Sequence, residues 1–438
     1  MRYFLISLGC AKNTVDAESM GQLLDAACHR PVDAPEKADV LIVNTCGFIE
    51  AARAESIGVL RELAGRKRPG QKLIAAGCLS QRYGEALIQQ APAVDGILGT
   101  RRWMDIVALV EQLRQGRRPA YDLPVEGVAA PDPAGVQRVA IQGSSAYLKI
   151  ADGCRRPCAF CAIPLIKGTA RSRRPEAIVA EARQLADRGV QEIVLIAQDT
   201  TDYGHDLGLR DGLAALVDGI LAAAPDLHWL RLMYAYPGAV TPRLIETMAR
   251  WPQVCHYLDL PLQHSHPDVL KRMRRPADVE RVQRQIEALR QAMPDLALRT
   301  TFIVGFPGET EAEFADVELF VREMGFDKVG VFTYSHEQGT AAADRADDVP
   351  PPVKQERYER LMALQQGISL ARNQEQVGRR LEVLLEGAGD GLSLGRSYRD
   401  APEIDGLVLI QEELPVGEMV RVRIVGAMAY DLVGVLER

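Results

Sequence analysis

The sequence predicts a multidomain α/β protein that ends in a small all-β domain. Residues 1–123 alternate short apolar runs with helical patterns, which is typical of an open parallel α/β domain. The alternation resumes over residues 144–375 and runs longer, which favours a partial parallel β/α barrel. Residues 376–438 carry short strand patterns separated by glycine-containing turns, as in a small β-barrel. A chain of 438 residues can bury a separate core in each of these domains.

The first domain is predicted from short apolar runs that are each followed by a helical pattern. The runs are residues 2–7, 40–44 and 72–76, and the helical patterns are residues 14–26, 49–63 and 81–90. Residues 91–113 add one more strand and helix. Residues 124–143 are rich in proline, glycine and small side chains, so we expect a linker there.

The second domain is predicted from six strand-like runs separated by helical stretches. These runs are residues 146–150, 192–197, 229–234, 256–260, 297–304 and 328–333. Three prolines at 350–352 then break the chain before a predicted helix over residues 353–376. The strands expected in the last domain are residues 381–386, 406–410, 419–425 and 432–436.

Three cysteines lie within eight residues, directly after the first strand of the second domain. Cys154, Cys158 and Cys161 are spaced so that their thiolates can converge on one face of a tight loop, as iron–sulfur ligation requires. A structural zinc site is the alternative, but it usually has a fourth Cys or His at matching spacing, and this loop contains no His. Three ligands for a four-iron cluster leave one iron open to bind and activate a small molecule.

A second cysteine set is predicted from topology. Cys10, Cys46 and Cys78 each lie just beyond the carboxyl end of a successive N-terminal strand. In an open parallel sheet those ends share one edge, where ligands and cofactors bind. Any one of these cysteines alone would be interpreted as core, but three at equivalent positions favour a second cluster. Cys28 and Cys255 have no comparable neighbours, and we interpret them as core or surface residues.

Composition and charge limit the partners and the cellular compartment that are compatible with this sequence. Hydrophobic residues make up 47% and charged residues 25% of the chain, which is typical of a globular protein. The net charge of −7 does not indicate nucleic-acid binding by the chain as a whole, and we expect no DNA partner. No segment reaches the length of a membrane-spanning helix. Eight cysteines and air-sensitive cluster chemistry predict a cytoplasmic protein.

Together these features resemble the methylthiotransferase family of radical S-adenosylmethionine enzymes, in the form that carries a C-terminal TRAM domain. The resemblance covers essentially the whole chain. Within the family, the local sequence resembles the RimO-type branch, whose substrate is a ribosomal protein, rather than the MiaB-type branch, whose substrate is tRNA. The segments that carry this resemblance are SLGCAKN at residues 7–13, NTCGFIE at 44–50, IAQDTT at 196–201 and GRSYRDAPEIDG at 395–406.

The resemblance implies two 4Fe-4S clusters and S-adenosyl-L-methionine as cofactors. The cluster at Cys154, Cys158 and Cys161 would bind and cleave S-adenosylmethionine, and the other would hold the sulfur to be inserted. The implied substrate is the β-carbon of an aspartate in small-subunit ribosomal protein twelve, either free or in the assembled ribosomal subunit. An electron donor such as flavodoxin or ferredoxin is implied as a partner.

Polar and glycine residues at the ends of the predicted barrel strands are candidates for cofactor contacts. Gln198 and Asp199 end the second strand, where either can hydrogen-bond S-adenosylmethionine, although a simple turn fits the sequence equally well. Gly305 and Gly308 follow the fifth strand, where glycine allows close backbone approach, and the resemblance places adenine nearby.

Other polar residues near these strand ends fit either a functional or a structural role. His264 follows the fourth strand and can be a polar contact or part of a capping turn. The basic segment 271–275 is interpreted as a helix end. A basic group after the cysteine loop is expected to balance the charge of a cluster and of the methionine carboxylate. This group is Lys167, Arg171, Arg173 and Arg174.

The net charge of the C-terminal domain helps to distinguish between two candidate substrates, tRNA and a ribosomal protein. Residues 377–438 contain seven Lys or Arg and eleven Asp or Glu, a net charge of −4. A barrel that binds tRNA through phosphates is expected to be basic, whereas an acidic barrel suits a basic protein. Two alternatives stay open: a tRNA methylthiotransferase acting on a modified adenosine near the anticodon, and a non-catalytic iron–sulfur redox protein.

Overall fold

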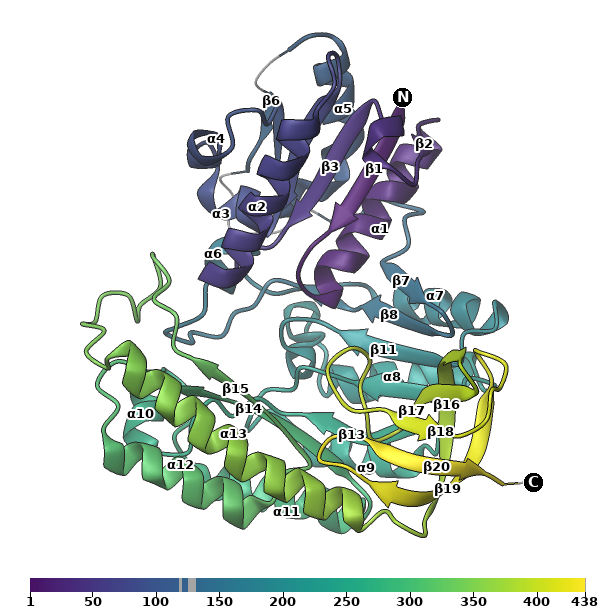
Figure 1. The fold of residues 1–438 in the computed structure, drawn as a ribbon, viewed down its shortest axis with the longest axis vertical. Coiled ribbons are helices and arrows are strands. Elements are labelled where there is room, and N and C mark those ends of the chain that lie inside the picture. The colour runs from purple at the N-terminus through teal and green to yellow at the C-terminus, as the bar shows by residue number, and fades with distance from the viewer. Residues whose placement is uncertain (118–119, 125–130, 438) are drawn as a thin grey trace.

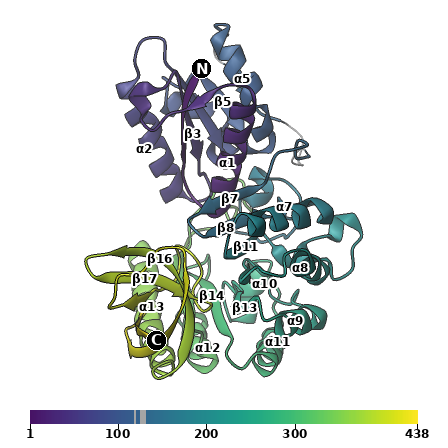
Figure 2. The same cartoon turned by 90° about the vertical axis from the view of Figure 1, so that its right-hand side faces the viewer.

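The computed structural model describes residues 1–117, 120–124 and 131–437 and has three parts (Figure 1). An α/β domain at the N-terminus stands at one end of the molecule. A curved central sheet lies next to it, and the C-terminal barrel packs against one side of that sheet (Figure 2). The predicted fold class is confirmed in each part.

The N-terminal domain is built on a six-stranded parallel sheet with the order β2-β1-β3-β4-β5-β6. These strands are β1 (Arg2–Ser7), β2 (Arg30–Pro31), β3 (Val40–Thr45), β4 (Lys72–Gly77), β5 (Gly96–Gly99) and β6 (Ala120–Asp122). Every residue of β3 is buried because helices cover both faces of the sheet. One face carries α1 (Ala11–Ala26) and α5 (Ile106–Arg114). The other carries α2 (Glu50–Arg66), α3 (Cys78–Tyr83) and α4 (Ala86–Gln90).

The strand order of this sheet reverses beside β1. The chain passes from β1 to β2 on one side and then returns to β3 on the other side. Ligands of open parallel sheets bind outside the carboxyl ends of the strands at such a reversal. Cys10 lies three residues after the end of β1 and Cys46 directly follows β3, so two predicted ligands lie at this position.

The central domain is a seven-stranded sheet with the order β15-β14-β13-β12-β11-β8-β7. Six strands are parallel and follow chain order: β8 (Ser145–Lys149), β11 (Glu192–Ile196), β12 (Trp229–Leu232), β13 (Val254–Asp259), β14 (Ala297–Val304) and β15 (Lys328–Thr333). Right-handed crossovers place the connecting helices on one face. These are α7 (Pro175–Asp187), α8 (Gly212–Ala223), α9 (Pro242–Arg250), α10 (Pro267–Arg272), α11 (Val279–Ala292) and α12 (Glu311–Met324), followed by α13 (Pro351–Gln374). The result is a partial β/α barrel.

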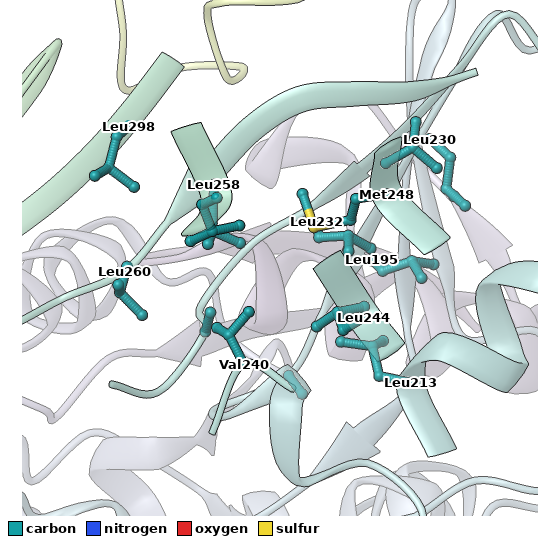
Figure 3. Close-up of a cluster of buried hydrophobic side chains, with 14 of the residues drawn as sticks. Leu195, Leu213, Leu230, Leu232, Val240, Leu244, Met248, Leu258, Leu260 and Leu298 are labelled. Atoms are coloured by element: carbon teal, nitrogen blue, oxygen red, sulfur yellow. The ribbon is translucent and has the colours of Figure 1, made fainter. Parts of the chain in front are cut away.

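The largest hydrophobic core lies between the strands of the central sheet and these helices (Figure 3). Leucines from the sheet, such as Leu195, Leu232 and Leu258, meet Leu213 of α8 and Met248 of α9. Each of these side chains is at most 4% exposed. Burying one such side chain contributes about 1.5–3 kcal/mol, so this core fixes the strand ends firmly.

The C-terminal domain is a closed barrel with the order β16-β17-β18-β20-β19. Its strands are β16 (Arg380–Gly389), β17 (Leu392–Ser397), β18 (Val408–Ile410), β19 (Met419–Ala427) and β20 (Leu432–Leu436). β17 is absent from the sequence-based prediction. The strand buries Ser393, Gly395 and Arg396 but exposes Leu392 and Leu394, so its hydrophobic pattern is the reverse of its burial.

Two other predictions about segments need correction. The predicted linker contains β7 (Val139–Gln142), which pairs antiparallel with β8 as the edge strand of the central sheet. Residues 125–130 of that linker lie outside the described residues. The single helix predicted over 81–90 is two short helices, because Gly84 with φ +52° ends α3.

The segment 395–406 attaches the barrel to the central sheet. Arg396 donates to Glu192 Oε2 of β11 at 2.6 Å, and Arg231 of β12 donates to Oε1 of the same carboxylate at 2.7 Å. Arg399 pairs with Asp327 at 2.6 Å, and Asp400 pairs with Lys328 at 2.8 Å. Tyr257 of β13 donates to Asp405 at 2.7 Å. The charged residues that carry the family resemblance in this segment therefore form a domain interface.

Glu192 gives this interface a pH dependence. Burial alone would raise the pKa of this fully buried carboxyl, but Arg231 and Arg396 lower its pKa from 4.5 to about 2. A carboxyl with a lowered pKa stabilises the fold above its ordinary pKa, and this contribution is lost as pH falls from 4.5 towards 2. The shift corresponds to about 3 kcal/mol.

We therefore expect Glu192→Gln to flatten the loss of stability between pH 4.5 and 2 relative to the wild type. Denaturant unfolding at a series of pH values measures this. Glu437→Gln is the control, since Glu437 pairs with Arg380, whose side chain is 75% exposed. Parallel pH curves for the wild type and Glu192→Gln would contradict the role given to this carboxylate.

Candidate functional site

The cysteine loop of the central domain is closed at its base by a short antiparallel pair of strands. β9 (Ala151–Asp152) and β10 (Arg171–Ser172) form this pair. Gly153 has φ +75°, and a Cβ there would lie 2.1 Å from the carbonyl oxygen of Thr169, so only glycine fits. The amide of Cys154 donates to Gly168 O at 3.0 Å. This closure turns Cys154, Cys158 and Cys161 into one compact loop.

The three thiols of this loop influence one another and are partly shielded from solvent. Burial raises the pKa of Cys154 to about 11 and that of Cys161 to about 12, and Cys158 adds to both shifts. Arg275 Nη1 lies 3.6 Å from Cys158 Sγ. The free thiols of Cys154 and Cys161 therefore stay protonated at neutral pH, and binding to iron would deprotonate them.

The second cysteine set meets at the carboxyl edge of the N-terminal sheet, as its strand-end positions predict. A Cβ at Gly9, whose φ is +92°, would lie 2.8 Å from Cys46 Cβ, so glycine permits the close approach of these two segments. Cys78 Sγ lies 3.5 Å from Asn13 Oδ1. Burial raises the pKa of Cys78 to about 12, with further contributions from Cys46 and Cys10.

The thiol-only composition of both sets suits iron–sulfur ligation. Within residues 1–117, 120–124 and 131–437, no three His, Cys, Asp or Glu side chains gather closely enough to hold one metal ion. A zinc ion needs all its ligands about 2.0–2.3 Å from one centre, whereas each thiolate of an iron–sulfur cluster binds a different iron. The donor set, three thiols without a His, also fits iron–sulfur ligation.

Both cysteine sets lie near the boundary between the N-terminal and central domains. Cys78 packs in one small buried cluster with Ala162, the residue after Cys161, and with Ile166. Arg101 of the N-terminal domain donates to the carbonyl oxygens of Leu165 at 2.7 Å and of Ile166 at 3.0 Å. The end of the cysteine loop is thus bound directly to the domain that carries the other set.

A buried charge network holds this arrangement. Asp16 of α1 accepts from Arg138 Nη2 at 2.5 Å, from Lys149 Nζ at 2.7 Å and from Lys167 Nζ at 2.7 Å. Its side chain is 2% exposed. Burial alone would raise the pKa of Asp16, but Lys149, Lys167 and Arg138 hold that pKa well below its ordinary value. Asp152 accepts from Lys149 at 2.7 Å and adds a second carboxylate.

This network changes the interpretation of the basic group after the cysteine loop. Lys167 is neutralised by Asp16, and Arg173 pairs with Glu181 at 2.6 Å. The structure thus pairs these two cations with carboxylates of the protein rather than leaving them free for a cofactor. Arg174 is exposed. In segment 271–275, Lys271 pairs with Asp268 of the same short helix, which agrees with a helix end.

The predicted contacts at the end of β11 lie beside the cysteine loop. Asp199 pairs with Arg156 of the loop at 2.7 Å and also accepts from Thr201. Gln198 Oε1 is buried without a hydrogen-bond partner among the described residues. An acceptor buried without a partner costs free energy, so it fits a ligand donor that is absent from the structure. Cofactor binding by Gln198 and Asp199 stays a prediction.

The glycines after β14 have different surroundings. A Cβ at Gly305, whose φ is +70°, would lie 2.3 Å from Lys354 Cγ, so glycine here makes room for the stem of Lys354. Gly308 has φ +76°, and its amide donates to Asp348 at 2.7 Å. Glu309 accepts from the amide of Gly305 at 3.0 Å and pairs with Arg357 at 2.8 Å. These contacts give the turn a structural role, and its contact with adenine stays a prediction.

His264 is buried beside this turn. Its Nε2 lies 3.5 Å from Glu309 Oε2 and has no hydrogen bond among the described residues. Its Nδ1 accepts from the amide of His266 at 2.9 Å. Both the polar-contact and the turn interpretation of His264 therefore have support.

Sequence reasoning missed several side chains at the site. Tyr236 lies between two guanidinium groups, with Arg156 4.1 Å and Arg275 4.3 Å from its ring centroid. Lys12 of α1 reaches the end of β11 and lies over the ring of Tyr234. The position of Arg156 between Cys154 and Cys158 could have marked it as a site residue from the sequence alone. Tyr236, which it contacts, is distant in sequence and could not have been found in this way.

Comparison with known proteins first defines a class. Residues 148–321 match the radical SAM superfamily, residues 2–99 match the uncharacterized protein family UPF0004, and residues 377–436 match the TRAM domain. A radical S-adenosylmethionine methyltransferase, TsrM from Kitasatospora setae, has a similar fold with a TM-score of 0.57 at 14% identity, over 90% of this chain and 77% of that chain. The chain is therefore a radical SAM protein, a class that uses S-adenosylmethionine and a 4Fe-4S cluster.

Full-length relatives narrow the class to a family. The chain is 52% identical to a protein of Roseiflexus sp. (strain RS-1), over 99% of this chain and 97% of the relative. It is 51% identical to one of Chloroflexus aurantiacus, over 99% of each. Both are named ribosomal protein uS12 methylthiotransferase RimO. The chain belongs to this family. No helix in the described part of the chain is long and apolar enough to cross a membrane.

The Asp16 network predicts a large effect of one substitution. Asp16→Asn leaves Arg138, Lys149 and Lys167 buried with too little negative charge, so we expect the free energy of unfolding to fall by about 3–5 kcal/mol. Asp33→Asn is the matched control, because Asp33 is 80% exposed in its pair with Lys37 and should contribute at most about 1 kcal/mol. Denaturant unfolding measures both variants, and equal losses would refute the role of the network.

Proposed function

We propose that this protein is a radical SAM methylthiotransferase that inserts a methylthio group at the β-carbon of an aspartate in ribosomal protein uS12. The observation that supports the proposal is that the two cysteine triplets lie near one domain boundary, where Cys78 of one set packs with Ala162, the residue after Cys161 of the other. The name shared by the full-length relatives gives the substrate. One triplet alone would suit S-adenosylmethionine cleavage, but a second one close by offers a separate place to hold the sulfur that is transferred.

The chain's own residues position the cofactors. Cys154, Cys158 and Cys161 would hold a 4Fe-4S cluster with one open iron, and Cys10, Cys46 and Cys78 would hold a second one. When bound, such a pair supplies reductive cleavage of S-adenosylmethionine and a site for the sulfur. Gln198 offers its unpartnered carbonyl to a donor group of S-adenosylmethionine, and Arg156 holds Asp199 beside the loop. Ala162 and Ile166 are fully buried and pack against Cys78, so this side of Cys78 is shielded from water.

The electron for cleavage must come from a partner, and we propose a flavodoxin or ferredoxin. Arg155 and Pro157 of the cysteine loop are exposed, so the cluster would lie close to the surface there. Short separation between a surface and a redox centre is what an external donor requires. Cytoplasmic location follows from the proposed substrate and remains part of the proposal.

A protein substrate fits the C-terminal barrel better than tRNA does. Of the seven basic residues of this domain, Arg396 and Arg399 are buried in ion pairs with Glu192 and Asp327. These two guanidinium groups cannot contact phosphate. The acidic excess of the domain therefore falls on a surface with few free cations, which suits a basic ribosomal protein.

Anaerobic mass spectrometry tests the proposal. Reconstituted enzyme, S-adenosylmethionine, sulfide and a strong reductant are incubated in parallel with uS12, with assembled small subunits and with bulk tRNA. We expect a methylthio mass gain on one aspartate of uS12. The same gain on tRNA alone would keep the chemistry but reject the substrate. No gain on any of them, with no 5′-deoxyadenosine formed, would favour a redox protein.

Replacing each cysteine set should separate the two halves of the reaction. With Cys154, Cys158 and Cys161 all changed to Ala, we expect no 5′-deoxyadenosine and roughly half of the bound iron, since only one of the two clusters remains. With Cys10, Cys46 and Cys78 changed to Ala, cleavage should persist while sulfur insertion stops. Cys28→Ala is the control, because this exposed cysteine belongs to neither set. Intact methylthiolation by the second variant would refute the two-cluster proposal.

A further inference from the structure

Lys12 is a cation at the junction of the two cysteine sets that lacks a carboxylate partner. It lies two residues after Cys10, in the first turn of α1. Its Nζ donates to Ala197 O at 3.4 Å and lies 3.1 Å from the ring centroid of Tyr234. Among the described residues, no carboxylate oxygen lies within the 4.0 Å of an ion pair with this ammonium group. An ammonium group has three donors, so Lys12 retains capacity to bind an anion.

Four neighbouring cations at this boundary pair with carboxylates of the protein. Lys149 and Lys167 pair with Asp16, and Arg156 pairs with Asp199. Arg299 of β14 pairs with Asp259 at 2.9 Å. In contrast to these paired cations, the half-buried Lys12 has no carboxylate partner among the described residues. Burying a charge without a partner is costly.

The backbone beneath Lys12 is held in an uncommon conformation. Tyr234 has φ +61°, a left-handed value that costs a non-glycine residue free energy. Its amide donates to Asp259 at 3.2 Å, and its carbonyl accepts from the amide of Thr200 at 3.1 Å. These bonds fix the ring as a platform for the ammonium group. The platform stands at the carboxyl ends of β11 and β12, where residues of a β/α barrel meet substrate.

We propose that Lys12 binds the side-chain carboxylate of the substrate aspartate and so selects that residue for modification. This inference rests on the proposed function. The β-carbon of aspartate is bonded directly to the carboxylate carbon, so a cation that fixes the carboxylate also fixes the carbon to be modified. Lys12 connects the two halves of the site, because it extends from the segment of Cys10 to Ala197, the residue before Gln198. Asparagine, which lacks the charge, would lose this interaction.

A double-replacement binding experiment tests this role. Reconstituted holoenzyme is titrated with uS12 and with uS12 in which the modified aspartate, located by mass spectrometry, is replaced by Asn. The wild type should bind the Asp protein roughly tenfold more tightly than the Asn protein. Lys12→Met should bind both proteins equally, at the level of the wild type with the Asn protein. Lys12→Arg should keep part of the preference, since it keeps the charge.

Controls separate this inference from its alternatives. Lys37→Met removes an exposed charge from the same domain and should keep the full preference. An unchanged preference in Lys12→Met would overturn the inference. So would a loss of S-adenosylmethionine affinity in that variant without a change in preference, because the carboxylate would then belong to the cofactor. A wild type that binds uS12 but never modifies it would instead reject the proposed function.

Discussion

The structure depends on the buried carboxylate of Asp16 and the three cations that surround it. Arg138, Lys149 and Lys167 come from the segment leading into β7, from β8 and from the end of the cysteine loop, whereas Asp16 comes from α1. A buried ion network binds strongly only in one geometry, because each charge removed from water needs its partner in place. The network thus fixes the N-terminal domain on the central sheet in a single orientation, and in that orientation Cys78 packs beside the end of the cysteine loop.

The sequence predicted those parts of the site that follow from local spacing or from strand ends. Cys154, Cys158 and Cys161 are close in the chain, and Cys10, Cys46 and Cys78 follow strands whose parallel order brings their ends together. The layered fold was predictable for the same reason, since buried parallel strands are continuous apolar runs. The cofactor contacts and domain boundaries given by the sequence remain predictions.

What the sequence did not predict depends on contacts between distant segments. Asp16 and Lys167 are 151 positions apart, and nothing in their local sequence marks them as partners. β17 was missed because its exposed positions are leucines and its buried ones are polar or small. Among its buried residues, Arg396 pairs with Glu192 of the central domain and Ser393 with backbone of the barrel, so hydrophobic alternation cannot identify this strand. Lys12 lies within the SLGCAKN motif, but its contact with Ala197 depends on how two domains meet.

The interface of segment 395–406 has a consequence for modularity. The C-terminal barrel has a small core of its own, yet its attachment to the central sheet consists of buried charges shared between both domains. A truncated chain without the barrel would leave Glu192, Asp327 and Lys328 without these partners, and the isolated barrel would expose Arg396 and Arg399. Each piece alone would therefore contain charged residues that have lost their ion-pair partners. Exchange of this barrel between relatives would require the facing residues of β11, β12 and β15 to be exchanged with it.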